Sequence, residues 1–371
     1  MKKALRIFIF IILAVTLIAA LGIALIINRP GDISASCKEF YAGMDNPPAE
    51  ALAWCQAGEY ISWKSTLPVN EDFDALNIFH ICQGNPDNPA ILMIHGYPTS
   101  SFDYAALAED LRQDFYVCML DTPGYGFSDK PLDGYDYSIF DDAHLVDEYI
   151  RQVVGLDEFT LLTHDKGDSV GLALLQIYQA YETSPYTIKH HFITNGNIYL
   201  PLAQLTRGQK VLLNPVSGPL ISSLMTGTSV AQSLADLAFA TTLPQSEIDS
   251  YASIFDYQDG IAVQHEIIKY LNERSENEVA WLETLERSDI PTTIIWGELD
   301  AIAPLAVSDY VWTNYLEDRE THAAYWRIPC ADHYLQADVP DLIVDIIRTT
   351  LAENEVPAEI DGTLCQAIKI R

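Results

Sequence analysis

Three ionisable residues in the second half of the sequence follow one another in an order that suits covalent catalysis. Asp165 follows the apolar run Phe159–Thr163 and precedes a stretch with helical periodicity. Asp300 follows the apolar run Thr292–Trp296, and His333 lies on a loop after the next such run. A carboxylate at a sharp turn can displace a leaving group from an sp³ carbon, and a histidine oriented by a second acid can then hydrolyse the ester. We therefore predict that Asp165 is the nucleophile, His333 the base and Asp300 the orienting acid.

A second interpretation of the same segment makes a serine the nucleophile. Residues 167–171 match the pattern G-x-S-x-G, in which Ser169 would occupy the strand-to-helix turn. That placement would carry a buried parallel strand through the polar residues 164–166. A turn at Asp165 ends the strand earlier and puts Gly167 where the chain needs a small residue. The sequence therefore favours Asp165 over Ser169.

Hydrolysis of an alkyl ester also requires an oxyanion hole. The loop His95-Gly96-Tyr97-Pro98 follows the strand-like run Ala90–Ile94. We predict that the backbone N–H groups of Tyr97 and Lys166 converge on the ester oxygen, and that His95 contacts the substrate. The sequence has no C-x-x-C pair and no zinc-ligand pattern, so we expect neither a metal nor another cofactor.

From about residue 75, strand-like and helical stretches alternate along the chain. This rhythm predicts an α/β fold over residues 75–194 and 289–352, with a mostly parallel sheet and helices on both faces. Residues 195–288 interrupt it with helical patterns alone, as is typical of an inserted cap that excludes water and shapes a pocket. Residues 31–74 are expected to be a polar connector, and residues 353–371 a C-terminal tail.

The first 30 residues have the pattern of a signal anchor. Lys2, Lys3 and Arg6 precede an apolar run over residues 7–27. At ~1.5 Å per residue such a helix would span roughly 30 Å, the thickness of a bilayer's hydrocarbon core. The run predicts one N-terminal transmembrane helix that is retained, with a cleaved signal peptide as the alternative. The cations place the N-terminus in the cytoplasm and the catalytic domain on the periplasmic or lumenal side.

The charge of the chain limits its partners. The sequence holds 21 basic and 52 acidic residues, a net charge of −31. Such a surface repels nucleic acid and anionic lipid, so we expect no nucleic-acid partner. The predicted aspartate chemistry implies a small-molecule electrophile as substrate.

Six cysteines are compatible with an oxidising compartment. Cys37 and Cys55 flank a short segment ahead of the catalytic domain, where they could form a disulfide. Cys82 and Cys118 lie in apolar, strand-like runs, so we expect them to be buried free thiols.

Three stretches resemble the epoxide hydrolase and haloalkane dehalogenase branch of the α/β-hydrolases. They are residues 95–101, 124–131 and 164–167, and the similarity extends from about residue 75 to residue 352. Residues 137–140, 164–169 and 194–196 look most like the mesoderm-specific transcript proteins. The resemblance implies an α/β-hydrolase fold with an inserted helical cap, and an ester intermediate on the aspartate.

The resemblance also indicates where this chain departs from its branch. Dehalogenases usually hold the halide with a tryptophan after the nucleophile and an asparagine in the oxyanion loop, where this chain has Lys166 and Tyr97. Epoxide hydrolases protonate the opening oxygen with two cap tyrosines. Tyr270 matches one of them, and Tyr251 and Tyr257 are the possible substitutes for the second.

These observations favour an epoxide hydrolase-like enzyme. A haloalkane dehalogenase-like hydrolase and a catalytically degenerate, membrane-anchored binding protein are the alternatives. Lys166 has two interpretations as well. It either lowers the pKa of the nucleophile or holds an anionic group of the substrate, or it points outward and pairs with Asp168.

Overall fold

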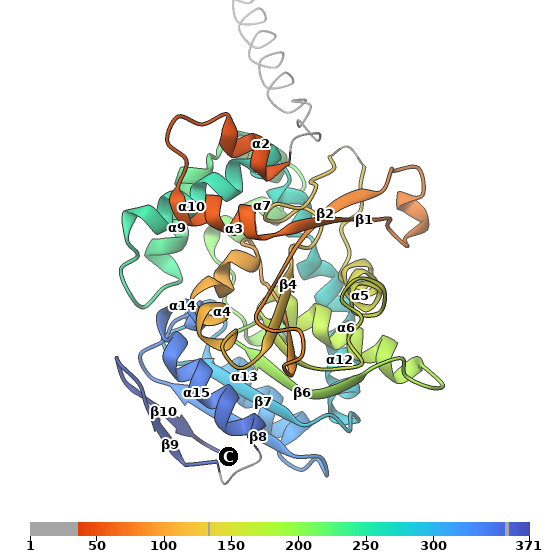
Figure 1. The fold of residues 1–371 in the computed structure, drawn as a ribbon, viewed down its shortest axis with the longest axis vertical. Helices are drawn as coiled ribbons and strands as arrows, with labels where there is room; N and C mark the ends of the chain where they lie inside the picture. Colours follow the sequence, from red (N-terminus) through yellow and green to blue (C-terminus); the bar gives the residue numbers. More distant parts are fainter. Residues whose placement is uncertain (1–35, 133, 353–355) are drawn as a thin grey trace, which may run out of the picture.

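The computed structural model describes residues 36–132, 134–352 and 356–371. Within these ranges ten strands form one sheet, in the order β1-β2-β4-β3-β5-β6-β7-β8-β10-β9 (Figure 1). The strands are β1 (Glu59–Trp63), β2 (Leu76–Gln83), β3 (Ala90–Ile94), β4 (Tyr116–Leu120), β5 (Glu158–His164), β6 (Thr187–Thr194), β7 (Thr292–Gly297), β8 (Ala323–Ile328), β9 (Glu359–Asp361) and β10 (Gln366–Lys369). The central six, from β4 to β8 in the sheet order, are parallel, and the outer strands pair antiparallel. The predicted α/β fold is confirmed.

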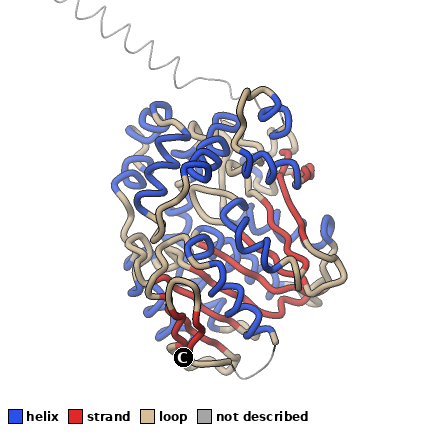
Figure 2. Tube along the Cα trace, turned by 60° about the vertical axis from the view of Figure 1, so that its left-hand side comes forward, coloured by secondary structure: helices blue, strands red, loops and turns tan. Residues whose placement is uncertain are grey.

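Helices cover both faces of this sheet (Figure 2). Every residue of β3 is buried, as expected of a strand between two helical layers. Its side chains alternate: Ile91 and Met93 pack with α4 (Ala105–Leu111) and α15 (Pro340–Leu351), whereas Leu92 and Ile94 pack with the layer that contains α5 and α6. The helices of that second layer are α5 (Ile139–Glu148), α6 (Lys166–Ala180), α12 (Tyr270–Glu286) and α13 (Leu305–Val311), and the short α14 (Leu335–Asp338) lies with α15.

The segment between β6 and β7 is the predicted helical insertion. All of its residues are described, and it contains helices without a strand. These are α7 (Arg207–Leu213), α8 (Ser217–Leu224), α9 (Gly227–Leu237), α10 (Gln245–Asp256), α11 (Gln264–Ile267) and α12.

The two segments that flank the catalytic core are more ordered than the sequence indicated. The expected connector contains α2 (Cys37–Ala42), α3 (Ala49–Ala57) and β1, which pairs antiparallel with β2. In the expected C-terminal tail, β10 pairs with β8 and β9 closes a hairpin. These short edge strands have mixed polar patterns, so no apolar run marks them in the sequence.

Three disulfides cross-link the described chain. Cys37–Cys55 joins α2 to α3, as the sequence allowed. The expectation of free thiols at Cys82 and Cys118 is wrong, because the two residues face each other across antiparallel strands β2 and β4 with their Cα atoms 4.2 Å apart. Cys330–Cys365 ties the loop after β8 to the C-terminal hairpin.

The predicted membrane helix at residues 7–27 lies outside the described residues. Within the described ranges, no helix has the length and apolar composition needed to cross a bilayer.

Candidate active site

Asp165 occupies the turn between β5 and α6. Its backbone dihedrals, φ 51° and ψ −112°, are unusual for a residue with a side chain. Such a conformation typically costs about 1–3 kcal/mol and is held only by surrounding structure. Two glycines permit it: a Cβ on Gly167 would lie 2.2 Å from the carbonyl oxygen of Ile94, and one on Gly96 would lie 2.6 Å from the Cβ of Asp165. The sharp turn predicted at Asp165 is therefore where the structure has it.

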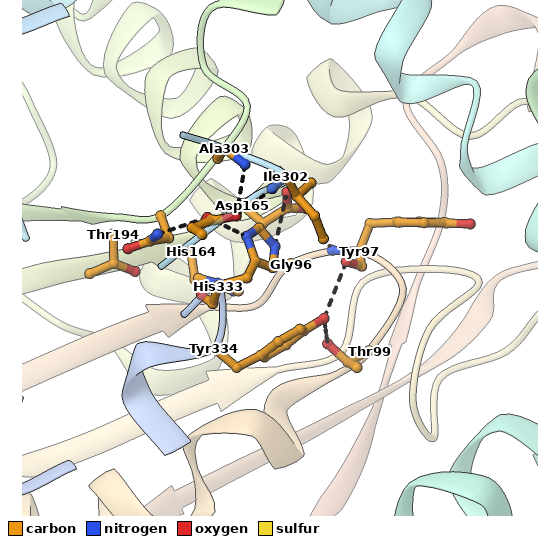
Figure 3. Close-up of polar contacts among 12 residues, drawn as sticks. Gly96, Tyr97, Thr99, His164, Asp165, Thr194, Ile302, Ala303, His333 and Tyr334 are labelled. Carbon is orange, nitrogen blue, oxygen red and sulfur yellow. Dashed lines mark hydrogen bonds and ion pairs between the residues drawn. The ribbon is translucent and has the colours of Figure 1, made fainter. Parts of the chain in front are cut away.

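His333 and Asp300 meet this aspartate above the ends of the strands. His333 Nε2 lies 3.6 Å from Asp165 Oδ2, and His333 Nδ1 donates a hydrogen bond to Asp300 Oδ2 at 2.8 Å (Figure 3). All three side chains are at most 3% exposed. The structure thus brings together the three residues that the sequence predicted as a set.

The carboxylate of Asp300 accepts four hydrogen bonds. Its Oδ1 accepts the backbone N–H groups of Ile302 and Ala303 at 2.7 and 2.8 Å, and its Oδ2 accepts Asn195 Nδ2 at 2.7 Å besides His333. Burial opposes ionisation, but His333 and these donors hold the pKa of Asp300 below its usual value. An anionic Asp300 keeps the proton of the imidazole on Nδ1 and leaves Nε2 facing Asp165.

The loop after β3 supplies a hydrogen-bond donor to Asp165. The backbone N–H of Tyr97 donates to Asp165 Oδ1 at 2.9 Å. Tyr334 supports the same loop, because its hydroxyl donates to the carbonyl oxygen of Tyr97 at 3.3 Å and lies 3.2 Å from Thr99 Oγ1 (Figure 3). Lys166, the other predicted donor, is the first residue of α6, directly after Asp165. The Tyr97 half of the predicted oxyanion hole already contacts the carboxylate.

Comparison with known proteins shows which family the chain belongs to. A family model described as alpha/beta hydrolase fold matches residues 89–196. The hydrolase LipZ of Mycobacterium tuberculosis is 30% identical over 272 residues, which are 73% of this chain and 91% of LipZ. The chain belongs to the α/β-hydrolase fold family.

Further similarities agree with this assignment. The mesoderm-specific transcript protein of Mus musculus is 31% identical to this α/β-hydrolase over 257 residues, 68% of this chain and 74% of that protein. Among solved structures, haloalkane dehalogenase DbeA from Bradyrhizobium elkani has 18% identity and a TM-score of 0.62 over 80% of this chain and 98% of DbeA, a likeness of fold. The resemblance that the sequence motifs indicated is confirmed, and the chain is a hydrolase-type enzyme.

The electrostatics of this α/β-hydrolase favour a charged imidazole in the resting state. Burial alone would lower the pKa of His333, but Asp300, its hydrogen bond and Asp165 together raise that pKa to about 9. A neighbouring His164, whose Nε2 donates to the carbonyl oxygen of His333 at 2.9 Å, stays neutral because burial lowers its pKa to about 4. The charged imidazole therefore balances two carboxylates in an enclosed site.

Two residues assigned to the site contact other groups. His95 Nδ1 donates to the carbonyl oxygen of Gly96 at 2.8 Å, and its Nε2 accepts the backbone N–H of Thr122 at 3.1 Å, so both nitrogens are engaged in the loop rather than turned to a substrate. Lys166 is buried and forms an ion pair with Asp142, while its Nζ lies 3.2 Å from Thr122 Oγ1. The interpretation in which Lys166 points outward to Asp168 is wrong, because its ammonium group is buried against the carboxylate of Asp142 on α5.

One of the three candidate tyrosines lies at the nucleophile. The hydroxyl of Tyr270, at the start of α12, donates to Asp165 Oδ1 at 3.4 Å. Tyr251 packs between Phe102 and Phe239, and the hydroxyl of Tyr257 bonds to Tyr60. Neither residue is among those that line the cavity beside His333, so the second tyrosine has no counterpart there.

Arg274 is a site residue that the sequence analysis missed. It is fully buried, its Nη2 donates to the backbone carbonyl of Asp165 at 2.9 Å, and its guanidinium lies 5.0 Å from the ring of Tyr270. Its Nε donates to Ser169 Oγ at 2.6 Å, which places Ser169 within α6 as a structural partner. The four-residue spacing from Tyr270 on one helix face was the available signal.

A cavity of about 280 Å³ opens beside the triad. His333, Tyr97 and Tyr334 line it together with Pro98 and Ile302, and the other lining residues belong to the cap. The cap contributes Thr206, Gly208, Gln209, Leu212, Met225, Ser229, Val230, Ser233, Leu234, Leu237, Ala238 and Gln264. No Asp, Glu, Lys or Arg is among the lining residues, so the cavity suits an uncharged, largely apolar molecule.

Proposed function

We propose that this enzyme opens an epoxide by forming an alkyl ester on Asp165 and then hydrolyses that ester. The observation that supports the proposal most directly is that the two carboxylate oxygens of Asp165 have different contacts. Oδ1 accepts the backbone N–H of Tyr97 at 2.9 Å, and Oδ2 faces His333 Nε2 at 3.6 Å. One oxygen is thus held in a donor site while the other is available for attack.

In the first step, Oδ2 of Asp165 attacks a ring carbon of the epoxide. A carbon–oxygen bond forms between the enzyme and the substrate, and the strained carbon–oxygen bond of the ring breaks. Tyr270, 3.4 Å from the carboxylate, gives its phenolic proton to the departing alkoxide oxygen. Ester formation removes the negative charge of Asp165, which is one of the contributions that raise the pKa of His333.

In the second step, His333 acts as the base. With the charge of Asp165 removed, Nε2 gives up its resting proton, which restores the phenol of Tyr270, and the neutral imidazole then accepts a proton from water. The hydroxide attacks the carbonyl carbon of the ester, and the developing negative charge resides on Oδ1, where the N–H of Tyr97 already points. The bond between the acyl carbon and the substrate oxygen then breaks, and the departing alkoxide takes a proton from His333 to complete the diol. The carboxylic acid of Asp165 loses its proton to the imidazole, which regenerates the carboxylate and the charged His333.

The residues beside the nucleophile favour this chemistry over halide displacement. Lys166 stands where a halide-binding tryptophan would, and its ammonium group is occupied by Asp142 and Thr122. Tyr270 supplies a proton that an epoxide oxygen needs and a departing halide does not.

We also propose that residues 7–27 anchor the enzyme, with its catalytic domain on the periplasmic or lumenal side. Three disulfides in the described chain support this location, because such bonds persist in oxidising compartments.

A screen of epoxides, haloalkanes and carboxylic esters tests the proposed reaction, with wild type and Asp165→Ala compared on each substrate. We expect diol formation from at least one epoxide, and none above background with Asp165→Ala. Halide release without diol formation would replace epoxide opening by dehalogenation. Ester hydrolysis that survives Asp165→Ala would exclude Asp165 as the nucleophile.

A further inference from the structure

The cap carries exposed apolar side chains on three consecutive helices, and one of them, Leu237, lines the cavity. Val211, Val216, Leu224 and Leu237 lie on or between α7, α8 and α9, and Val216 and Leu224 are 84% and 61% exposed. Exposed apolar residues that gather on one face, in contrast to single scattered ones, mark a surface that contacts something apolar.

The same stretch is nearly free of charge. Between residues 204 and 244, only Arg207, Lys210 and Asp236 are charged, a net of +1 over 41 residues. The whole chain is 20% charged and has a net charge of −31. A bilayer surface would repel most of this protein and would accept this face.

The cavity opens through this face. Its lining includes the exposed residues Gly208, Ser229, Ser233 and Leu237, which belong to α7 and α9. An apolar molecule that leaves a membrane at this mouth would reach His333 through a passage whose other lining side chains are uncharged.

The described chain begins on the side of the cap. Helix α2 packs on the cap helix α10, where Tyr41 and Ser253 share a hydrogen bond of 2.9 Å, and Figure 1 shows α2 at the same end of the molecule as α7, α9 and α10. Eight residues, 28–35, separate the apolar run at residues 7–27 from Ser36. At ~3.3–3.6 Å per residue, that link reaches roughly 30 Å at most, so an anchored chain holds this end near the membrane.

We propose that the face formed by α7, α8 and α9 contacts the lipid bilayer, and that the cavity receives an uncharged substrate directly from the membrane. The contact itself depends on the cap surface and on the anchor. The statement about the substrate rests on the proposed hydrolase function. Entry from the membrane limits the substrate to an electrophile that partitions into lipid, such as an epoxide on a long alkyl chain.

Depth-dependent quenching in proteoliposomes tests the contact without any reference to catalysis. The six native cysteines form three disulfides, so a cysteine introduced into the full-length chain is the single reactive thiol. Leu224→Cys and Val216→Cys would each be labelled with an environment-sensitive fluorophore and placed in phosphatidylcholine vesicles that contain spin-labelled lipid. Val279→Cys, on α12 and 51% exposed, is the matched control outside the proposed face.

We expect lipid quenching and a blue-shifted emission at positions 216 and 224, and neither at position 279. Equal quenching at all three positions, or none at 216 and 224, would overturn the contact. A blue shift that depends on protein concentration and not on the quencher would mean that a second copy of the chain covers this face, and would overturn it as well.

Activity tests the route of the substrate. Val216→Glu and Leu224→Glu alter exposed side chains that do not line the cavity. In the reconstituted full-length enzyme, we expect the double variant to hydrolyse a long-chain epoxide dissolved in the vesicles about tenfold more slowly, because two buried apolar contacts are lost. Hydrolysis of a short, water-soluble epoxide should be unchanged. Delivery through this face would be excluded if the double variant slowed neither substrate or slowed both by the same factor. If wild type turned over no epoxide at all, the proposed function would be refuted, and the quenching result would still stand.

Discussion

Arg274 of the cap holds the backbone of Asp165 through a hydrogen bond of 2.9 Å to its carbonyl oxygen. The same guanidinium bonds to Ser169 and lies over the ring of Tyr270, so one buried cation joins the nucleophile turn to the last cap helix. Because the turn is conformationally strained, this link is expected to position the nucleophile rather than to react.

Replacing Arg274 should therefore lower both the free energy of unfolding and kcat. We expect Arg274→Lys to lower the free energy of unfolding by about 2 kcal/mol, because lysine cannot donate both directed hydrogen bonds, to the carbonyl oxygen of Asp165 and to Ser169 Oγ. Urea denaturation measures the loss, and Arg287→Lys, at the exposed end of the same helix, should change it by less than about 0.5 kcal/mol. A variant as stable as wild type with an unchanged kcat would contradict a positioning role.

Replacement of Tyr270 should slow the reaction with an epoxide and leave the reaction with a haloalkane unchanged. We expect Tyr270→Phe to slow alkylation by an epoxide about 10²–10⁴-fold, since the opening oxygen loses its proton donor. Alkylation by a haloalkane of similar size should proceed at an unchanged rate, because a halide leaves without a proton. Rapid-quench mass spectrometry measures both rates. An equal loss with both substrates would assign Tyr270 to holding the carboxylate instead.

The stability of the protein should depend on pH through His333. Its folded pKa of about 9 lies above the value near 6.5 expected in the unfolded chain, so folding binds the proton more tightly. The resulting stabilisation, roughly 3 kcal/mol, is complete below pH ~6.5 and is lost as the pH rises through about 9. Denaturation of wild type and His333→Gln between these limits should show the wild-type advantage shrinking toward high pH. A constant difference would contradict the raised pKa.

The buried pair of Lys166 and Asp142 should respond differently to single and double substitution. Burial raises the pKa of Asp142 to about 6 even with Lys166 beside it. We expect Lys166→Met to cost about 3–5 kcal/mol, because it leaves a buried carboxylate uncompensated, and Lys166→Met with Asp142→Leu to recover most of that loss. Thermal unfolding of the three proteins tests this expectation. A single variant as stable as the double variant would mean that Asp142 is already neutral.

The sequence was sufficient to place the turn at Asp165, because a buried strand that continued through three polar residues would be unfavourable. The structure has the turn there, although β5 extends one residue further than expected and ends at the buried His164. The positions of Asp300 and His333 followed from the apolar runs that precede them, since the carboxyl ends of parallel strands meet at one edge of the sheet.

Contacts between distant segments were beyond the sequence. Cys82 and Cys118 each lie in a strand that the apolar pattern predicted, but only the antiparallel register of β2 and β4 puts them opposite each other. The partner of Lys166 is likewise set by the packing of α5 against α6, which brings Asp142 across 24 positions of chain. Arg274 was missed because a charged residue on a helix is ordinarily exposed.

The covalent intermediate provides the most direct measurement. His333→Gln keeps the nucleophile and removes the base, so an epoxide substrate should alkylate the enzyme and remain attached. Intact-protein mass spectrometry should show an increase equal to the mass of the epoxide, peptide mapping should locate it on Asp165, and His333→Gln with Asp165→Asn should show none. If an epoxide that wild type converts to diol leaves His333→Gln unmodified, or modifies a residue other than Asp165, the proposed mechanism is wrong.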